Sequence, residues 1–189
     1  MKGKRYTTQG KYWSLFKTTI GFGGVVASED GLLEVLLPFA GKCRDELVVW
    51  INSLYPLIAM ENQVTRNAAL LLEKYFAGEK VSFGLPICWL SFTPFMSAVY
   101  EAVRDIPYGS VQSYGEVASK IGHPRSARGV GAAMANNPLP IIIPCHRVVG
   151  ASGGLIGYSA PGGIMSKKWL LLLEGLAVTG TRCNQQEVG

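Results

Sequence analysis

A cysteine and a histidine stand side by side in the segment Pro144-Cys145-His146-Arg147-Val148. The segment follows the apolar run 141–143 and precedes a glycine-rich stretch. This order predicts a thiol presented at the mouth of the fold beside its own base. A free cysteine with a pKa of about 8.5 is only partly ionised at neutral pH, so a nucleophilic thiol needs a base or a positive field. We therefore expect Cys145 to be a nucleophile and His146 its base, acting directly or through a water.

The charge distribution adds a second indication. The net charge is +5, and no Asp or Glu occurs from Val117 to Leu173. The basic residues of this acid-free stretch are Lys120, Arg125, Arg128, Arg147, Lys167 and Lys168. Unopposed positive charge of this kind favours contact with phosphates. The alternative is an ordinary solvated basic face.

Several classes of protein and site are disfavoured. Four widely spaced cysteines without a CxxC pair indicate no disulfide scaffold, and two histidines give no zinc site of usual spacing. We expect no metal and no cofactor. The basic N-terminus lacks the apolar core of a signal peptide, and no apolar run is long enough to span a membrane. We expect an intracellular, cytoplasmic location, or a nuclear one in a eukaryote.

The elements around these residues predict an α+β fold. Residues 23–27 and 32–37, joined by the turn 28–31, resemble a β-hairpin. Helices are expected over 45–54 and 65–77, followed by an extended stretch over 81–91. We expect an N-terminal domain over residues 1–88, a C-terminal domain over 89–178 and a tail over 179–189.

The second half is expected to be mostly helical, starting with a helix near Pro94 that ends before Pro107. Ser113 and Glu116 have the spacing of a capping box, which predicts a helix over 114–121. After a tight turn at 122–125, Ser126 is expected to cap a helix over 127–136. Two short helices joined by such a turn form a helix-turn-helix.

The second of these helices, ARGVGAAMAN, has small side chains almost throughout. Gly129 and Gly131 each cost about 1 kcal/mol of helix stability relative to alanine, which suggests close approach by another backbone. Two explanations stay open. One is tight helix–helix packing, and the other is a smooth helix against a narrow DNA groove, with Arg128 reaching into the base stack.

From Leu70 to Gly175 the chain resembles the O6-alkylguanine-DNA alkyltransferase family. The resemblance is carried by Tyr75-Phe76-Ala77-Gly78, Ile106-Pro107-Tyr108-Gly109, Ser113 to Ala118, Arg128-Gly129-Val130-Gly131, Asn136-Asn137-Pro138, Ile143 to Val148, Gly157-Tyr158-Ser159, Lys167 and Leu172 to Gly175. It implies a small N-terminal sheet domain of ribonuclease-H-like topology before a helical DNA-binding domain. It also implies irreversible, single-turnover transfer of an alkyl group from O6-alkylguanine, and less firmly from O4-alkylthymine, to Cys145.

The resemblance also implies roles for individual residues. Glu174 supports His146, Asn137 holds the active-site turn, and Tyr114 donates a hydrogen bond to the base. Arg128 fills the gap left by a flipped nucleotide. The remaining expected contacts to substrate or DNA are Ser113, Ala127, Met134, Arg147, Val148, Tyr158, Ser159 and Lys167. The expected partner is double-stranded DNA approached through the minor groove, bound by a monomer.

The sequence departs from the family pattern at two places, and three other classes of protein are alternatives to this family. Phe95-Met96-Ser97-Ala98-Val99-Tyr100 differs from the family's usual start of this domain, and Ala160-Pro161 resembles an insertion beside the alkyl pocket. An alkyltransferase-like lesion binder would lack the nucleophile that Cys145 supplies. A helix-turn-helix regulator would need polar base-reading side chains, which ARGVGAAMAN largely lacks. A cysteine hydrolase would need a family signature that is absent from this sequence.

Overall fold

The structure, a computed structural model, describes residues 10–55 and 61–184. These residues divide into two compact units, one before Pro94 and one from Pro94 onward. Each unit is described by itself below. Within the described ranges, the helices are all too short or too polar to cross a membrane.

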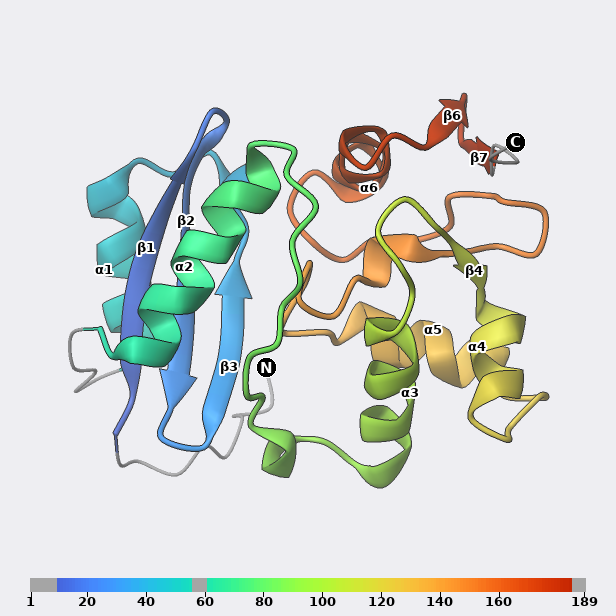
Figure 1. Ribbon diagram of the computed structural model, residues 1–189, viewed down its shortest axis with the longest axis horizontal. Coiled ribbons are helices and arrows are strands. Elements are labelled where there is room, and N and C mark those ends of the chain that lie inside the picture. Colours follow the sequence, from blue (N-terminus) through green and yellow to red (C-terminus); the bar gives the residue numbers. More distant parts are fainter. Residues whose placement is uncertain (1–9, 56–60, 185–189) are drawn as a thin grey trace. The chain divides into compact units, whose positions relative to one another are not determined.

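An antiparallel sheet forms the centre of the N-terminal unit (Figure 1). Its strands β1 (Tyr12–Thr18), β2 (Gly21–Ser28) and β3 (Gly31–Leu36) lie in sequence order. The predicted hairpin is therefore confirmed as β2 and β3, and β1 adds a third strand. At the turn, the Ser28 hydroxyl accepts from the Asp30 amide at 3.2 Å. Gly31 has a φ of +133°, which favours glycine at the start of β3.

Two helices, α1 (Arg44–Leu54) and α2 (Gln63–Phe76), cover opposite faces of this sheet (Figure 1). Along β1, Ser14 donates to Thr65 of α2 at 2.9 Å, and Phe16 stacks on Phe76 of the same helix. The alternate residues Trp13 and Leu15 pack into a cluster on the other face. The strand's two-residue period therefore produces two separate cores.

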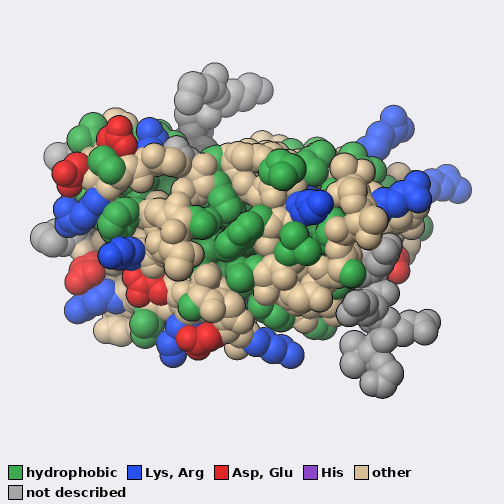
Figure 2. All heavy atoms as spheres, turned by 90° about the horizontal axis from the view of Figure 1, so that it is seen from above, with side chains coloured by type: hydrophobic (Ala, Val, Ile, Leu, Met, Phe, Trp, Pro, Cys, Tyr) green, Lys and Arg blue, Asp and Glu red, His purple; other side chains and the backbone are tan. Residues whose placement is uncertain are grey.

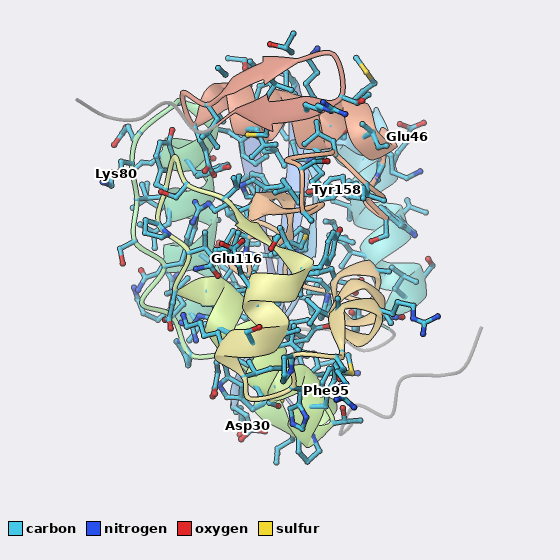
Figure 3. All side chains as sticks on the ribbon, turned by 90° about the vertical axis from the view of Figure 1, so that its right-hand side faces the viewer. Asp30, Glu46, Lys80, Phe95, Glu116 and Tyr158 are labelled. Carbon is cyan, nitrogen blue, oxygen red and sulfur yellow. The ribbon has the colours of Figure 1, made fainter. Side chains whose placement is uncertain are left out.

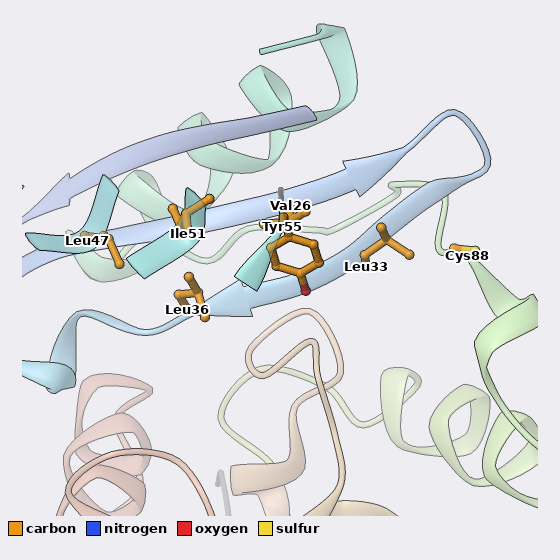
Figure 4. Packing of buried hydrophobic residues seen from close by; sticks show 7 residues of the cluster. All are labelled: Val26, Leu33, Leu36, Leu47, Ile51, Tyr55 and Cys88. Carbon is orange, nitrogen blue, oxygen red and sulfur yellow. The ribbon is translucent and has the colours of Figure 1, made fainter. Parts of the chain in front are cut away.

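The cluster on the α1 face is shown in Figure 4. It consists of Val26, Leu33, Leu36, Leu47, Ile51, Tyr55 and Cys88, with Leu47 and Ile51 four residues apart on one side of α1. Both predicted helices are confirmed, although each begins one or two residues earlier than expected. A capping box starts α2, because the side chain of Asn62 accepts from the Thr65 amide at 2.9 Å.

The extended stretch before the second unit is attached to the sheet. The amide of Leu32 donates to the carbonyl of Pro86 at 2.9 Å, and the amide of Cys88 donates back to Leu32 at 3.1 Å. Short 3₁₀ turns η1 (Pro38–Ala40) and η2 (Trp89–Ser91) lie on either side of the helical pair in sequence. These hydrogen bonds explain why the stretch up to Thr93 packs with the N-terminal unit.

The C-terminal unit begins with α3 (Pro94–Arg104), followed by the predicted helix-turn-helix, α4 (Tyr114–Lys120) and α5 (Ala127–Ala135) (Figure 1). The capping box at α4 is confirmed: the Ser113 amide donates to Glu116 at 2.6 Å, and the Glu116 amide donates to Ser113 at 3.1 Å. The expected side-chain cap at Ser126 is wrong. Its ψ of 25° is not extended, and its amide instead donates to the His123 carbonyl at 2.9 Å.

The remaining elements of this unit lie around the Cys145 segment. A 3₁₀ turn, η3 (Cys145–Arg147), leads into β5 (Val148–Val149), which pairs in parallel with β4 (Gln112–Ser113). Helix α6 (Gly163–Leu173) follows, and then a hairpin of β6 (Ala177–Thr179) and β7 (Arg182–Asn184). The tail expected from residue 179 onward thus contains a paired strand.

Gly23 is opposite Phe16 in the sheet register, and a Cβ on Gly23 would overlap the buried Phe16 ring. Gly23→Ala is therefore expected to lower the free energy of unfolding by about 1–3 kcal/mol through overpacking. Urea denaturation measures the loss. The control is Gly84→Ala, because Gly84 is exposed and nothing lies within 4 Å of a Cβ there. Equal stability of the two variants would contradict this packing.

Candidate active site

The backbone before Cys145 is tightly constrained. The Asn137 side chain donates to the Ile143 carbonyl at 2.8 Å and accepts from the Leu139 amide at 3.0 Å, so one amide group bridges the turn. Ile141 has a φ of +75°, which is rare for a β-branched residue. Its side chain is 1% exposed, so the surrounding core holds this conformation. Asn137 thus occupies the position predicted for it, across the turn that leads to the thiol.

A buried carboxylate joins the two residues that follow the thiol. Nε2 of His146 lies 2.7 Å from Oε1 of Glu174, and both side chains are fully buried. Arg147 donates to the same carboxylate through Nε at 2.9 Å and through Nη2 at 2.9 Å. The amide of Gly109 also donates to Glu174, at 3.1 Å. Glu174 therefore has charged and neutral donors around it, as a buried carboxylate requires.

The protonation states follow from these contacts. Burial acts to raise the pKa of Glu174, but hydrogen bonds from His146 and Arg147 and the positive charge of Arg147 outweigh it and hold the pKa well below 4.5. Burial lowers the pKa of His146, although the hydrogen bond and negative charge of Glu174 act to raise it. An ionised Glu174 beside a neutral His146 requires the proton on Nε2. Nδ1 then carries the lone pair that accepts a proton.

The Cys145 thiol is 6% exposed. Burial raises the pKa of Cys145, while a hydrogen bond from Asn137, the charge of Lys167 and a hydrogen bond from Tyr158 act in the opposite direction. The Tyr158 hydroxyl is itself buried, and burial raises its pKa well above 10. Figure 3 labels Tyr158 in the loop before α6. This arrangement keeps the thiol protonated at rest and supplies groups that stabilise it when it ionises.

Lys167 is a buried cation whose charge acts on Cys145. It is fully buried, and its ammonium donates to the Val148 carbonyl at 2.6 Å and lies 5.9 Å from the centroid of the Tyr114 ring. Burial lowers the pKa of Lys167 to about 8, against the influence of Cys145 and Cys183. At neutral pH most of this lysine remains a cation, so it provides a positive field inside the unit.

Residues 94–176 match the family model "6-O-methylguanine DNA methyltransferase, DNA binding domain". The methylated-DNA–protein-cysteine methyltransferase of Methanosarcina acetivorans is 39% identical over 87% of this chain and 98% of its own length. The chain belongs to the methylated-DNA–protein-cysteine methyltransferase family. The constitutive family member of Bacillus subtilis is 34% identical over 78% of this chain and 86% of its own length.

Solved structures of family members agree with the fold. The Mycobacterium tuberculosis O6-methylguanine methyltransferase matches with a TM-score of 0.66 and 34% identity, over 87% of this chain and 92% of that one. A structure of the M. tuberculosis protein in complex with DNA matches with a TM-score of 0.68 at the same identity, over 87% of this chain and 93% of that one. The expected α+β class and family resemblance are both confirmed.

The helix-turn-helix of α4 and α5 has a packed inner face. A Cβ on Gly129 would lie 3.1 Å from the Phe95 ring, and the Tyr100 hydroxyl donates to the Ala133 carbonyl at 2.9 Å. Phe95 also meets His123 edge-on. Gly129 thus has a packing explanation, through the Phe95 ring rather than through another helix backbone. Arg128 lies exposed on the same helix, and its predicted role in filling the gap left by a flipped nucleotide stays a prediction.

Other predicted residues are placed as follows. Arg147 and Lys167, which were expected to contact substrate or DNA, are both buried and hydrogen-bonded inside the unit. Burying these cations requires partners, which Glu174 and backbone carbonyls provide. Met134 and Val148 are buried, Ala127, Ser113 and Tyr158 are half-buried, and Ser159 is exposed.

On the face shown in Figure 2, Lys and Arg side chains of the C-terminal unit, at the right, have few acidic neighbours. The acid-free stretch includes two buried cations, Arg147 and Lys167, and exposed cations such as Arg125 and Arg128.

Several functional contacts were missed from the sequence. The Tyr114 hydroxyl donates to the Ile156 carbonyl at 3.0 Å, and the carbonyl of Ile106 accepts from Arg147 at 2.7 Å. Both acceptors are backbone oxygens, which leave no trace in residue identity. Gly109 could have been found from the sequence, because it belongs to one of the segments that carry the family resemblance. Its φ of +74° explains why a glycine is needed there.

Glu174→Gln is expected to lower the free energy of unfolding by about 3–5 kcal/mol at neutral pH, because it leaves the Arg147 cation buried without its counter-charge. The contribution depends on pH. The folded pKa lies below the unfolded one, so the contribution is present above about pH 4.5 and is lost as the pH falls through the folded value. Urea denaturation across this range measures both effects.

The control for this variant is Asp105→Asn, which breaks an ion pair to Lys120 whose side chains are 69% and 41% exposed. It is expected to cost less than about 1 kcal/mol. Equal losses in the two variants, or a Glu174→Gln deficit that stays constant from pH 7 well into the acid range, would contradict the buried ion-pair description.

Proposed function

We propose that the protein transfers the alkyl group of O6-alkylguanine in DNA irreversibly to Cys145. The observation that carries this is the 2.7 Å contact between His146 and Glu174, directly beside a buried thiol. A fixed Nε2–H tautomer turns the imidazole into a base of defined orientation. Family membership supports the reaction class, since the relatives are named as methyltransferases whose acceptor is a protein cysteine.

The residues divide the work as follows. Nδ1 of His146 takes the thiol proton, directly or through a water, and Lys167 stabilises the thiolate. The sulfur attacks the alkyl carbon, the S–C bond forms, and the C–O bond to guanine breaks. The thiol proton ends on the guanine, so atoms and charge balance. The Tyr114 hydroxyl, whose pKa burial and Cys145 raise, stays protonated and donates a hydrogen bond to the leaving base.

The product is a thioether, and the described residues include no group that would hydrolyse it. Each molecule therefore acts once. The same displacement at an sp³ carbon suits O4-alkylthymine, which we propose as a lesser substrate.

Access to the lesion requires base flipping, because the O6 substituent is hidden within a duplex. We place α4 and α5 against the minor groove, where the small side chains of α5 permit close approach and contacts independent of sequence. Arg128 fills the vacated stack, while Ser113 and Ala127 contact the backbone. Met134, Val148, Tyr158 and Ser159 surround the base and its alkyl group. One M. tuberculosis relative was crystallised with DNA, which supports a DNA partner.

We further propose that the protein acts as a monomer in a reducing, intracellular compartment. Cysteines 43, 88, 145 and 183 are all free thiols. A nucleophilic thiol that acts once must reach its lesion unoxidised, and cytosolic conditions keep it so.

Mixing the protein with duplex DNA that contains one O6-methylguanine is expected to add the mass of one methylene, mapped by peptide analysis to Cys145. Intact-mass spectrometry measures the gain, which should stop at one per molecule. Cys145→Ala is expected to gain nothing while still binding the duplex, and Cys43→Ala, at an exposed thiol, should behave like the wild type. Duplex binding by the wild type without any mass change would refute the transfer.

Arg128→Ala is expected to weaken binding of the lesion duplex by about 1–3 kcal/mol, because the flipped state loses the side chain that replaces the base. Transfer from the free base O6-benzylguanine should be unchanged, since no stack is involved. The matched control is Arg66→Ala, an exposed arginine on α2. Fluorescence anisotropy and mass spectrometry supply the two readouts, and similar duplex affinities for both variants would exclude the role of Arg128.

A further inference from the structure

We propose that the C-terminal hairpin of β6 and β7 clamps loop 150–156 and thereby holds the Tyr114 hydroxyl in the position from which it assists alkyl transfer. Cys183 and Gly153 are the positioning residues of this clamp. The inference rests on the proposed function, because Tyr114 has a task only if a base leaves beside it.

Residues 181–183 of the hairpin pair with residues 153–155 of the loop through backbone hydrogen bonds. The Cys183 amide donates to the Gly153 carbonyl at 2.9 Å, and the Leu155 amide donates to the Thr181 carbonyl at 2.7 Å. Gly154 pairs with Arg182 in antiparallel fashion between these two bonds. The loop is thus held by a short β-ladder rather than by side chains alone.

Gly153 makes this approach possible. Its φ is +75°, and a Cβ at this position would collide with the Cys183 carbonyl. The opposing atom belongs to the backbone, so no rotamer change relieves the collision. Within the loop, the Gly150 amide donates to the Gly154 carbonyl at 2.8 Å and the Gly153 amide donates to the Gly150 carbonyl at 2.9 Å, which closes a tight turn.

The Cys183 side chain anchors the hairpin to the unit. It is 5% exposed and packs in a cluster with Val149, Leu155, Leu171 and Leu176. These residues come from β5, the loop, α6 and the segment after α6. Burial raises the pKa of Cys183, which suits an apolar packing role.

The hairpin is connected to Tyr114 through the peptide unit between Leu155 and Ile156. Leu155, which the hairpin holds, is followed by Ile156, and the Ile156 carbonyl accepts from the Tyr114 hydroxyl at 3.0 Å. The bond to Ile156, whose neighbour Leu155 the hairpin holds, orients the phenol before the lesion enters. Because a hydroxyl has one proton, the donor then turns from the Ile156 carbonyl to the leaving base. A displaced loop would move this acceptor and leave the phenol free to rotate away from the leaving base.

The first test is the single-turnover rate of transfer from an O6-methylguanine duplex. Gly153→Ala is expected to slow transfer in the bound complex about tenfold through misplacement of Tyr114, with duplex affinity nearly unchanged. The control is Gly41→Ala, at a φ of +65° with nothing within 4 Å of a Cβ, which carries the same backbone strain without a collision. Equal rates for the two variants would overturn the proposal.

A second measurement separates positioning from general disruption. If the clamp acts through the phenol, Gly153→Ala should have little additional effect in a Tyr114→Phe background. Fully multiplicative losses in the double variant would overturn the proposal. Should Gly153→Ala fail to fold, Cys183→Ser places a hydroxyl in the apolar cluster and loosens the same hairpin, with the same expected coupling.

Docking of the hairpin is measured without any transfer. N-ethylmaleimide should label Cys183 slowly in the wild-type protein and many-fold faster in Gly153→Ala, as read by peptide mass analysis. Labelling of wild-type Cys183 as fast as in urea would show an undocked hairpin and refute the clamp. A wild type that protects Cys183 but transfers nothing would instead refute the proposed function.

Discussion

The buried carboxylate of Glu174 organises the residues around the thiol. It receives hydrogen bonds from His146, Arg147 and the Gly109 amide, which come from two segments far apart in the sequence. Because an unpaired charge is so costly away from water, the three donors and their acceptor constrain one another. The imidazole beside Cys145 therefore has a fixed orientation before any substrate arrives.

The position of Glu174 depends on α6. Glu174 follows the last residue of that helix, and its amide donates to the Leu170 carbonyl at 3.1 Å. A carboxylate at a helix C-terminus meets the negative end of the helix dipole, which is unfavourable. The bidentate contact from Arg147 compensates for this, which gives the arginine that follows Cys145 and His146 a structural role.

The local chemistry of this fold could be predicted from the sequence. The Ser113–Glu116 capping box, the hairpin around Gly31 and the Cys145–His146 pair all depend on neighbours within a few positions. The backbone partners of Arg147 and Lys167 could not be predicted, because backbone carbonyls accept from any donor that the fold brings near. Ser126 shows the same limit, since a cap depends on the ψ of one residue and the preceding turn set it. The pairing of β7 with loop 150–156 is a contact between distant segments that no local pattern encodes.

The parallel pairing of β4 with β5 places Ser113 opposite Val149. The first of these residues starts the helix that we place on DNA, and the second lies four residues beyond the nucleophile. This ladder joins the start of α4 to the segment that follows Cys145. Any effect of DNA binding on the thiol is matched by an equal effect of the chemical state of the thiol on DNA binding.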